Sequence, residues 1–303
     1  MLKGRSLQTN WPYPQQASST KMIDQAPNQR RSTGKSVAKW HSCVDSGDWD
    51  PKAVLLVGGK GTRLRSVVPS APKPLARFGK CSFLELLVRQ LRHQGIRQIV
   101  MCTGYLADQI NREFGDGHDL DVLIEYSREP NPLGTAGAVK LAECYLRDVP
   151  EFLVMNGDSF LEIDFRHLIG FHRETGGLVS MAVRRVNDAA RYGTVHVDNR
   201  HRVVCFAEKM GIKSPGLVNA GVYAFSRETI AYIQDGPASL ETDVFPQLLD
   251  YGVYALEQYG TFFDIGTPED YERAQHLRDH LYEAAFRTRT SVADSIPPHT
   301  GES

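Results

Sequence analysis

The stretch Ala53-Val-Leu-Leu-Val57, Gly58-Gly-Lys-Gly-Thr-Arg-Leu64 decides the fold. Five consecutive apolar residues predict a short strand that is buried on both faces of a sheet. The glycines that follow leave backbone N–H groups uncovered by side chains, so these groups can point at phosphate oxygens. Arg63 and, a few residues later, Lys73 add two cations. A buried strand, a bare backbone turn and two cations together suit a polyphosphate ligand.

Two well-known phosphate loops do not fit this stretch. A P-loop requires G-x-x-x-x-G-K-[ST], but Gly59-Lys60 is followed by Gly61, and Val54 stands five positions before Gly59. The dinucleotide fingerprint G-x-G-x-x-G fails because Leu64 stands at the third glycine position. A Gly-rich surface turn between a strand and a helix is the alternative interpretation.

Length and composition are ordinary for a soluble globular protein. The 303 residues suffice for one large domain or two modest ones, and 41% are hydrophobic and 23% charged. A formal net charge of −1 argues against a general nucleic-acid binder. The sequence has neither the apolar core of a signal peptide nor a stretch near the roughly 20 apolar residues of a membrane span. We therefore expect a cytoplasmic protein without nucleic-acid or membrane partners.

The cysteines agree with a reducing compartment. There are five of them, an odd number, and none form a C-x-x-C pair, so we expect neither a disulfide framework nor a zinc site. Cys102 and Cys205 stand in apolar runs, which predicts that both are small core residues.

The order of predicted elements indicates an α/β fold. After the opening strand, Ser82 and Glu85 form a capping box at the start of a helix that ends at Gly95. Strands over residues 96–102 and 121–126 follow, with a helix between them. This alternation predicts a three-layer sandwich with a mostly parallel, Rossmann-like central sheet. Short strands between residues 178 and 225 predict a small mixed or antiparallel extension of that sheet.

A second glycine turn precedes the next predicted helix. Pro130 and Pro132 favour an extended approach, and Gly134 to Gly137 then present bare backbone before a helix that reaches about Tyr145. Ligands of such sheets bind beyond the carboxyl ends of the strands, so both glycine turns should lie on the same rim. Small residues needed for helix packing are the alternative explanation.

Two aspartates are candidate magnesium ligands. Residues 152–155 predict a fourth strand, which ends in Asn156-Gly-Asp158, and Mg²⁺ prefers one or two carboxylates together with phosphate oxygens and water. A turn or hairpin built on the same residues is the alternative. Asp264 precedes a helix that begins with Thr267 and Pro268, which we expect to reach about Tyr282; alone, Asp264 could be a carboxylate that stabilises the helix start.

Taken together and in order, the motifs resemble the signature of the sugar-phosphate nucleotidyltransferases. The resemblance covers about residues 52–280 and rests on Gly58-Gly-Lys-Gly-Thr-Arg-Leu64, Pro72-Lys-Pro74, Pro132-Leu-Gly-Thr-Ala-Gly137, Asn156-Gly-Asp158, Glu208-Lys209, Asn219-Ala-Gly221 and Asp264-Ile-Gly-Thr-Pro-Glu-Asp-Tyr271.

Some details are most similar to the guanylyltransferases that act on D-glycero-D-manno-heptose 1-phosphate. These details are Arg65-Ser-Val-Val68, Asn187-Asp188 before Arg191-Tyr-Gly-Thr-Val195, and Phe262-Phe-Asp-Ile-Gly266. Mannose-1-phosphate guanylyltransferases and other hexose-1-phosphate enzymes are close alternatives.

The resemblance implies an activity and a set of roles. An NTP, expected to be GTP, and a sugar 1-phosphate would give an NDP-sugar and pyrophosphate for the synthesis of surface-glycan precursors. Arg63 would face the departing pyrophosphate, and Lys73 the α-phosphate or the sugar phosphate. The implied nucleotide-binding residues are Gly58, Gly59, Gly61, Thr62, Gly134, Thr135 and Gly157; the sugar-binding residues are Gly193, Glu208, Lys209 and Asn219; the Mg²⁺ ligands are Asp158 and Asp264.

Blander interpretations stand beside these roles. Arg63 could form an exposed salt bridge, which would contribute at most about 1 kcal/mol, and Glu208 with Lys209 could be a solvated charge pair. A regulatory relative that only binds a nucleotide sugar would be expected to lack Arg63, Lys73 or the aspartates, which are all present. A glycosyltransferase on a similar sheet would carry Asp-x-Asp, whereas this chain has Asn156 at the first position.

The domain prediction has three parts. Residues 1–50 are polar and without periodicity, which predicts a disordered leader, although Trp11, Trp40 and Trp49 leave open a short partner-binding arm. Residues 51–285 form the nucleotidyltransferase domain, and residues 286–303 a disordered tail. The expected partners are small-molecule substrates, and a homo-oligomer is left open.

Overall fold

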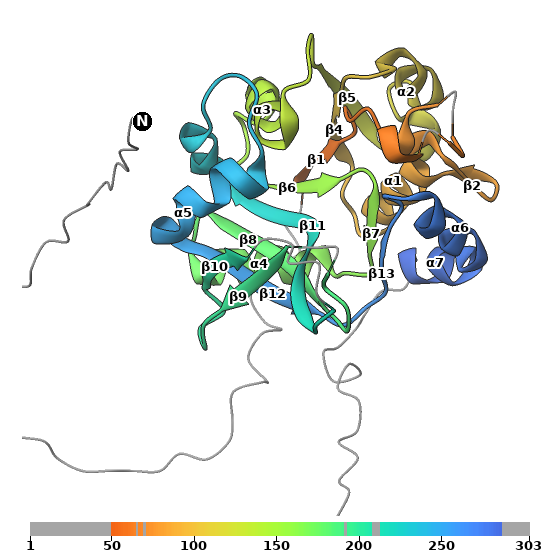
Figure 1. The fold of residues 1–303 in the computed structure, drawn as a ribbon. Coiled ribbons are helices and arrows are strands. Elements are labelled where there is room, and N and C mark those ends of the chain that lie inside the picture. The colour runs from red at the N-terminus through yellow and green to blue at the C-terminus, as the bar shows by residue number, and fades with distance from the viewer. Residues whose placement is uncertain (1–49, 65, 69–70, 191–192, 208–212, 287–303) are drawn as a thin grey trace, which may run out of the picture. The chain divides into compact units, whose positions relative to one another are not determined.

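A computed structural model describes residues 50–64, 66–68, 71–190, 193–207 and 213–286 (Figure 1). The predicted leader, apart from residue 50, and the predicted tail, apart from residue 286, lie outside these ranges. Glu208 and Lys209, two of the predicted sugar-binding residues, also lie outside them.

Strand β1 (Lys52–Leu56) occupies the centre of the sheet, as its apolar run predicts. It pairs in parallel with β4 (Gln98–Thr103) on one side and with β6 (Glu151–Asn156) on the other (Figure 1). Beyond β4 lies β5 (Leu123–Arg128), also parallel. The side chains of Ala53, Val54 and Leu55 are completely buried, because β1 is covered on both faces.

Beyond β6 the sheet becomes mixed. Strand β11 (Gly216–Ser226) is antiparallel to β6 and to β8 (Val179–Val186), and β12 (Val253–Gln258) is parallel to β8. Strands β9 (Thr194–Val197) and β10 (Val203–Ala207) form an antiparallel edge beside β11. These strands form one nine-stranded sheet, and the predicted extension is therefore mixed, because β12 runs parallel to its neighbour.

Helices cover both faces of this sheet and make three layers. On one face, side chains of α1 (Phe83–His93), α2 (Ala107–Phe114) and α4 (Phe165–Thr175) form a core with Ala53 and Leu55. On the other face, α3 (Gly134–Leu141) and α5 (Phe245–Gly252) form a second core with Val54. Figure 1 shows α1 and α2 on one side of β1 and β4 and α3 and α5 on the other. The predicted α/β three-layer architecture is confirmed.

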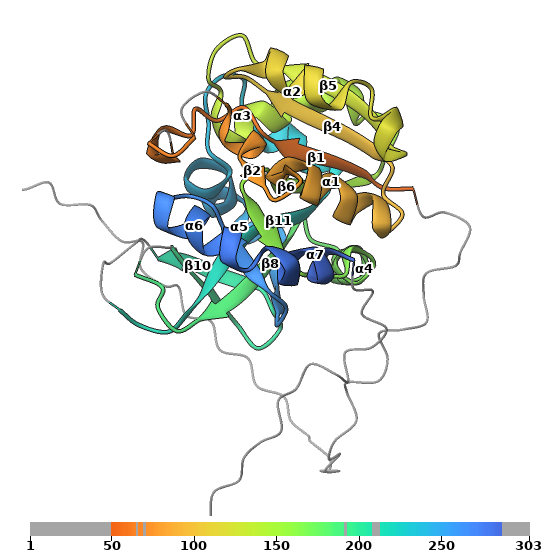
Figure 2. The same ribbon diagram turned by 90° about the vertical axis from the view of Figure 1, so that its right-hand side faces the viewer.

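A third core joins the C-terminal helices to the start of the domain. Helices α6 (Pro268–His276) and α7 (Arg278–Ala285) pack near α1 and the short hairpin of β2 (Arg77–Phe78) and β3 (Cys81–Ser82) (Figure 2). Just before them, β13 (Phe262–Asp264) pairs antiparallel with β7 (Ser159–Leu161), with Asp264 opposite Ser159. This pairing brings Asp264 beside the loop that carries Asp158.

The hairpin alternative for residues 156–163 is wrong, because β7 pairs with β13 and not with β6. Helices α1 and α6 begin as predicted: Ser82 Oγ accepts the Glu85 amide, and Thr267 Oγ1 accepts the Asp270 amide.

Two other expectations are also wrong. Cys205 is exposed and not a core residue, because β10 is an edge strand whose register shifts between Val203 and Cys205. The last predicted helix does not continue to Tyr282. The chain bends at Leu277, which is exposed, while Ala274 and Leu281 on either side are buried.

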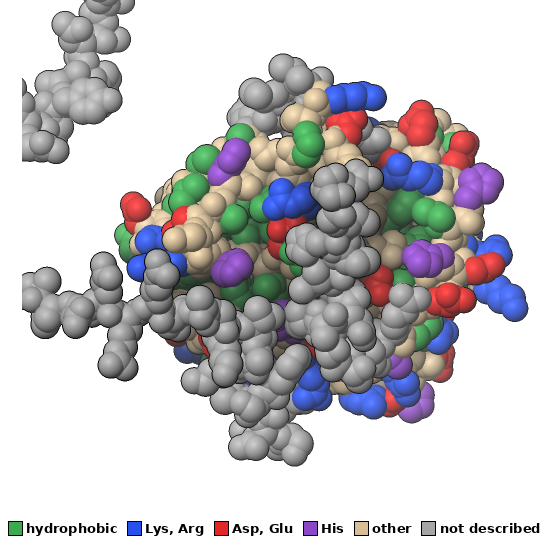
Figure 3. All heavy atoms as spheres, turned by 90° about the horizontal axis from the view of Figure 1, so that it is seen from below, with side chains coloured by type: hydrophobic (Ala, Val, Ile, Leu, Met, Phe, Trp, Pro, Cys, Tyr) green, Lys and Arg blue, Asp and Glu red, His purple; other side chains and the backbone are tan. Residues whose placement is uncertain are grey.

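The described surface has mixed charge. Figure 3 shows Lys and Arg side chains interspersed with Asp and Glu side chains over the face that it presents. Among the described helices, none combines the length and the hydropathy that crossing a bilayer requires.

Candidate active site

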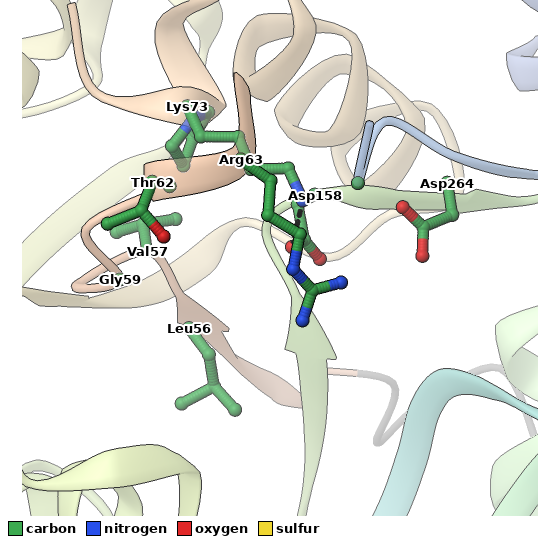
Figure 4. A pocket seen from close by; sticks show the side chains of 11 residues that line it. Leu56, Val57, Gly59, Thr62, Arg63, Lys73, Asp158 and Asp264 are labelled. Carbon is green, nitrogen blue, oxygen red and sulfur yellow. Dashed lines mark hydrogen bonds and ion pairs between the residues drawn. The ribbon is translucent and has the colours of Figure 1, made fainter. Parts of the chain in front are cut away.

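A pocket lies where β1 and β6 end, at the carboxyl edge of the parallel strands. Figure 4 shows its side chains, which come from the glycine loop, the Pro72-Lys73-Pro74 turn, the loop after β6 and the end of β13. The lining residues are Leu56, Val57, Gly59, Gly61, Thr62, Arg63, Lys73, Pro74, Asp158, Asp264 and Gly266. The two predicted cations and the two predicted aspartates thus meet in one pocket.

The glycine loop approaches Lys73 closely at Gly61, where only a glycine fits. Gly61 has φ of +55°, and a Cβ there would lie 2.6 Å from the Cβ of Lys73, so any larger residue would displace the lysine. A Cβ at Gly59 would meet no atom within 4 Å, because this part of the loop faces open space. The loop backbone at Gly59 is therefore accessible to a ligand, as predicted from the sequence.

Lys73 and Asp158 form an ion pair inside the pocket. The Lys73 ammonium donates a hydrogen bond to Asp158 Oδ2 at 2.7 Å (Figure 4), and the two side chains are 12% and 38% exposed. The lysine is part of a short 3₁₀ turn, Lys73–Leu75, in which Pro74 is buried. The carboxylate compensates the charge of a largely buried ammonium, which would otherwise be costly to desolvate.

Arg63 is placed differently. It belongs to the 3₁₀ turn Thr62–Leu64, where Leu64 is buried and anchors the turn while Arg63 and Thr62 are exposed. Its guanidinium has no ion-pair or hydrogen-bond partner among the described residues, and Figure 4 shows it extending into the pocket. The exposed salt bridge that the sequence left open is not formed within the described chain. The charge is available for an anionic ligand.

Asp264 is half-buried in the wall of the pocket. Burial raises the pKa of its carboxyl above the usual value, the negative charge of Asp158 raises it further, and Lys73 and the Gly266 amide partly offset both effects. Its Oδ1 atom is buried and has no hydrogen-bond partner in the described structure. A carboxylate that has an orphaned oxygen and lines the same pocket as a second carboxylate is a candidate ligand for a divalent cation.

Two predicted nucleotide-binding glycines lie just outside the pocket lining. A Cβ on Gly157 would lie 2.4 Å from Val57 Cγ1, and the Gly157 amide donates to the Leu56 carbonyl at 3.0 Å. Gly58 leaves room for Glu129, whose Oε1 would lie 2.4 Å from a Cβ at Gly58. Both glycines allow close packing beneath the loop, whatever contact their backbones make with a ligand.

The second glycine turn lies beside the first but outside this pocket. Glu129 connects them, because its Oε2 accepts the Leu133 amide at 2.9 Å while its Oε1 lies against Gly58. Gly134 has φ of +71°, and a Cβ there would lie 2.5 Å from the Ala238 carbonyl oxygen. Glu129 therefore links the two glycine turns without lining the pocket, and the sequence interpretation assigned it no role. Burial raises the pKa of its carboxyl.

The Thr135 hydroxyl forms hydrogen bonds with a segment that is distant in the sequence. Thr135 Oγ1 accepts the Leu240 amide at 2.8 Å and donates to Glu241 Oε2 at 3.0 Å. Glu241 stands in a π-helix, Leu240–Val244, that precedes α5, and the sequence analysis assigned it no role. Its partner Thr135 is 106 residues away in the chain, so no local pattern could identify the contact.

The described sugar-binding candidates lie on the mixed half of the sheet. Asn219 on β11 accepts the Gly221 amide at 3.0 Å and donates to the Tyr223 hydroxyl at 2.7 Å. Gly193 directly precedes β9, where a Cβ would lie 3.3 Å from the Ala207 carbonyl oxygen. Neither lines the pocket of Arg63 and Lys73.

Comparison with known proteins assigns a family to this geometry. Residues 52–279 match the nucleotidyl transferase family. A mannose-1-phosphate guanylyltransferase of Mycobacterium tuberculosis is 39% identical over 225 residues, which are 73% of this chain and 62% of that protein. A D-glycero-alpha-D-manno-heptose 1-phosphate guanylyltransferase of Campylobacter jejuni is 35% identical over 225 residues, which are 73% of this chain and 96% of that protein.

Solved structures agree with the sequence comparison. A crystal structure of HddC from Yersinia pseudotuberculosis in complex with GMP-PN superposes with a TM-score of 0.67 and 32% identity, over 75% of this chain and 98% of that one. The chain spans about three fifths of the length of the mannose-1-phosphate guanylyltransferases that it matches.

Proposed function

Because the chain belongs to the nucleotidyl transferase family, we propose that it joins GTP and a sugar 1-phosphate to give a GDP-sugar and pyrophosphate. The observation that supports this most is the meeting of Arg63, Lys73, Asp158 and Asp264 in one pocket at the ends of β1 and β6. Two polyanions must approach each other in this reaction, so catalysis depends on positioning and on neutralising charge.

Different residues of the pocket bind the nucleotide and the sugar phosphate. The backbone around Gly59 and the Thr62 hydroxyl hold the nucleotide phosphates, and the Arg63 guanidinium stabilises the departing pyrophosphate. Lys73 draws the α-phosphate and the sugar phosphate together. An oxygen of the sugar phosphate attacks the α-phosphorus, and the bond from that phosphorus to the pyrophosphate breaks, in line with the new bond.

Asp158 and Asp264 would hold Mg²⁺. The orphaned Oδ1 of Asp264 fits such a role, since a buried carboxylate oxygen without a partner gains most from a cation. No group of three or more Asp, Glu, His or Cys side chains in the described residues is arranged around a metal, so most ligands would come from phosphates and water. When bound, the ion would supply charge neutralisation at the reacting phosphates.

The sugar is the less determined partner. We propose D-glycero-D-manno-heptose 1-phosphate, supported by the resemblance of residues 262–266 to enzymes for that substrate and by the similarity to the Campylobacter jejuni protein of that name. Mannose 1-phosphate is the second candidate, supported by 39% identity to the Mycobacterium tuberculosis protein. We place the product in surface-glycan precursor synthesis in the cytoplasm.

Pyrophosphate release tests the proposal. The purified protein is incubated with Mg²⁺ and each of GTP, ATP, UTP, CTP and dTTP against heptose 1-phosphate, mannose 1-phosphate and glucose 1-phosphate. We expect release with GTP and one manno-configured sugar phosphate, and none from the Asp158→Asn variant. Nucleotide-sugar binding without release in any combination would favour a regulatory relative, and transfer from a GDP-sugar to an acceptor would favour a glycosyltransferase.

A further inference from the structure

The segment before α5 is joined to the second glycine turn by backbone hydrogen bonds. The Ala136 amide donates to the Ala238 carbonyl at 3.0 Å, and the Ala238 amide donates to the Leu133 carbonyl at 2.9 Å. The Leu240 amide adds a hydrogen bond to Thr135 Oγ1 at 2.8 Å. The position of the turn at the start of α3 is therefore set by a segment about a hundred residues later in the chain.

Glu241 extends this junction with its side chain. Its carboxylate accepts hydrogen bonds from the hydroxyls of Thr135 at 3.0 Å, Ser239 at 2.9 Å and Tyr223 at 3.4 Å. No Lys or Arg of the described chain forms an ion pair with it. Since an ionised carboxylate only accepts, it fixes the direction in which each of these hydroxyls donates.

Tyr223 continues the series of hydrogen bonds from Glu241 to β11. Its side chain is completely buried, and burial together with the nearby Glu241 carboxylate raises the pKa of its phenol well above the usual value. The hydroxyl donates to Glu241 and accepts from Asn219 Nδ2 at 2.7 Å. The Gly221 amide fixes the other end of the Asn219 amide group at 3.0 Å. An unbroken series of hydrogen bonds thus runs from Thr135 through Glu241 and Tyr223 to Asn219.

We infer that Glu241 is a positioning residue that couples the nucleotide side of the site, at Gly134 and Thr135, to the sugar side, at Asn219. The inference rests on the proposed function for the identity of those two sides. In this series, each hydrogen bond fixes whether the next group donates or accepts. A substrate that orders one end of the series therefore also orders the other end. Each substrate should therefore raise the affinity for the other, and Glu241 should carry that effect.

Calorimetry with α,β-methylene-GTP, a GTP analogue that cannot release pyrophosphate, tests the coupling. The affinity for the sugar 1-phosphate that wild type turns over is measured with and without the saturating analogue, in the presence of Mg²⁺. Wild type should bind the sugar phosphate at least about 5-fold more tightly with the analogue, the lower end of usual coupling between sites. In Glu241→Gln the ratio should fall to about 1, because an amide cannot accept from hydroxyls at both ends.

A second variant and a control make the result decisive. Tyr223→Phe breaks the same series one step further on and should lose the ratio as well, even if Glu241→Gln does not fold. Thr242→Ala removes an exposed hydroxyl whose one hydrogen-bond partner among the described residues is Asp243, and it should keep the wild-type ratio. Wild-type ratios in folded Glu241→Gln or Tyr223→Phe would overturn the inference while pyrophosphate release still supports the proposed function. Absence of pyrophosphate release from wild type would overturn both.

Discussion

The two halves of the sheet contribute differently to the site. In the parallel half, β1 and β6 each end in a loop that brings a charged side chain to the rim, so Arg63 and Asp158 are only a few residues from a buried strand. In the mixed half, β11 contributes neutral groups that form hydrogen bonds with distant partners, as Tyr223 does with Glu241. The comparison indicates that Arg63 and Asp158 reach the pocket through short strand-to-loop segments, whereas the hydrogen-bonded groups of β11 depend on partners elsewhere in the chain.

The largest expected effect is at the charged rim. Asp158→Asn should reduce kcat by about 10³-fold or more, because it removes a candidate metal ligand and the partner of Lys73. The fold should persist, since the Asp158 side chain is 38% exposed. Pyrophosphate release and circular dichroism measure the two effects. Wild-type turnover with Mg²⁺ in this variant would remove the metal assignment.

Arg63→Met should reduce kcat by about 10²-fold and leave the melting temperature unchanged. The guanidinium has no partner in the described chain, so its loss costs the fold nothing, while the departing pyrophosphate loses a charged donor. Arg200→Met removes the same charge from an exposed turn between β9 and β10 and serves as the control. Equal kinetics of the two variants would show that Arg63 has no part in the reaction.

The mixed half should instead respond through stability and pH. His172 is buried between Ser180 and Ser226, each at 3.0 Å, and burial lowers its pKa to about 4. The unfolded chain takes up this proton near pH 6.5 and the folded chain only near pH 4, so stability is lost as pH falls through this interval. Between pH 7 and 5 the loss is about 2 kcal/mol.

His172→Gln should lower stability at pH 7 but remove most of that additional loss at pH 5. Urea unfolding at the two pH values measures it. A variant with the wild-type pH dependence would show that another group is responsible.

Asp264→Asn should raise the melting temperature of the metal-free protein at pH 7.5 while abolishing turnover. A raised folded pKa means that the ionised carboxyl destabilises the fold above that pKa, and this cost disappears as pH falls. Thermal melts at pH 7.5 and pH 4.5 should therefore show a larger difference between wild type and variant at the higher pH. A variant that melts below wild type at pH 7.5 would mean that Asp264 supports the fold.

Deletion of residues 1–45 should have the smallest effect. The family match begins at residue 52, and β1 begins at Lys52. We expect kcat and the melting temperature to stay within experimental error of wild type. A collapse of either would show that this segment contributes to the folded domain or its site.

Prediction from the sequence succeeded where a motif is local. The buried strand, the glycine loop and the helix N-caps at Ser82 and Thr267 are contained in a few consecutive residues, and all were placed correctly. Because the rim of a parallel sheet gathers the carboxyl ends of its strands, the meeting of Arg63 with Asp158 followed from the same reasoning.

Prediction failed where long-range pairing decides. Cys205 has apolar neighbours in sequence, but β10 is an edge strand, which a single sequence does not reveal. Glu241 contacts Thr135 only because the π-helix Leu240–Val244 packs against α3. Asp264 reaches Asp158 only through the pairing of β13 with β7, where the resemblance and not periodicity supplied the expectation.

The central claim is that one carboxylate from the parallel half and one from the C-terminal strand hold the same cation beside Arg63 and Lys73. A crystal grown with Mn²⁺ and α,β-methylene-GTP, measured at the manganese edge, tests it most directly. We predict an anomalous peak within coordination distance of both Asp158 and Asp264, with the analogue's phosphates over the Gly59 loop. A peak bound elsewhere, or phosphates outside this pocket, would contradict the account.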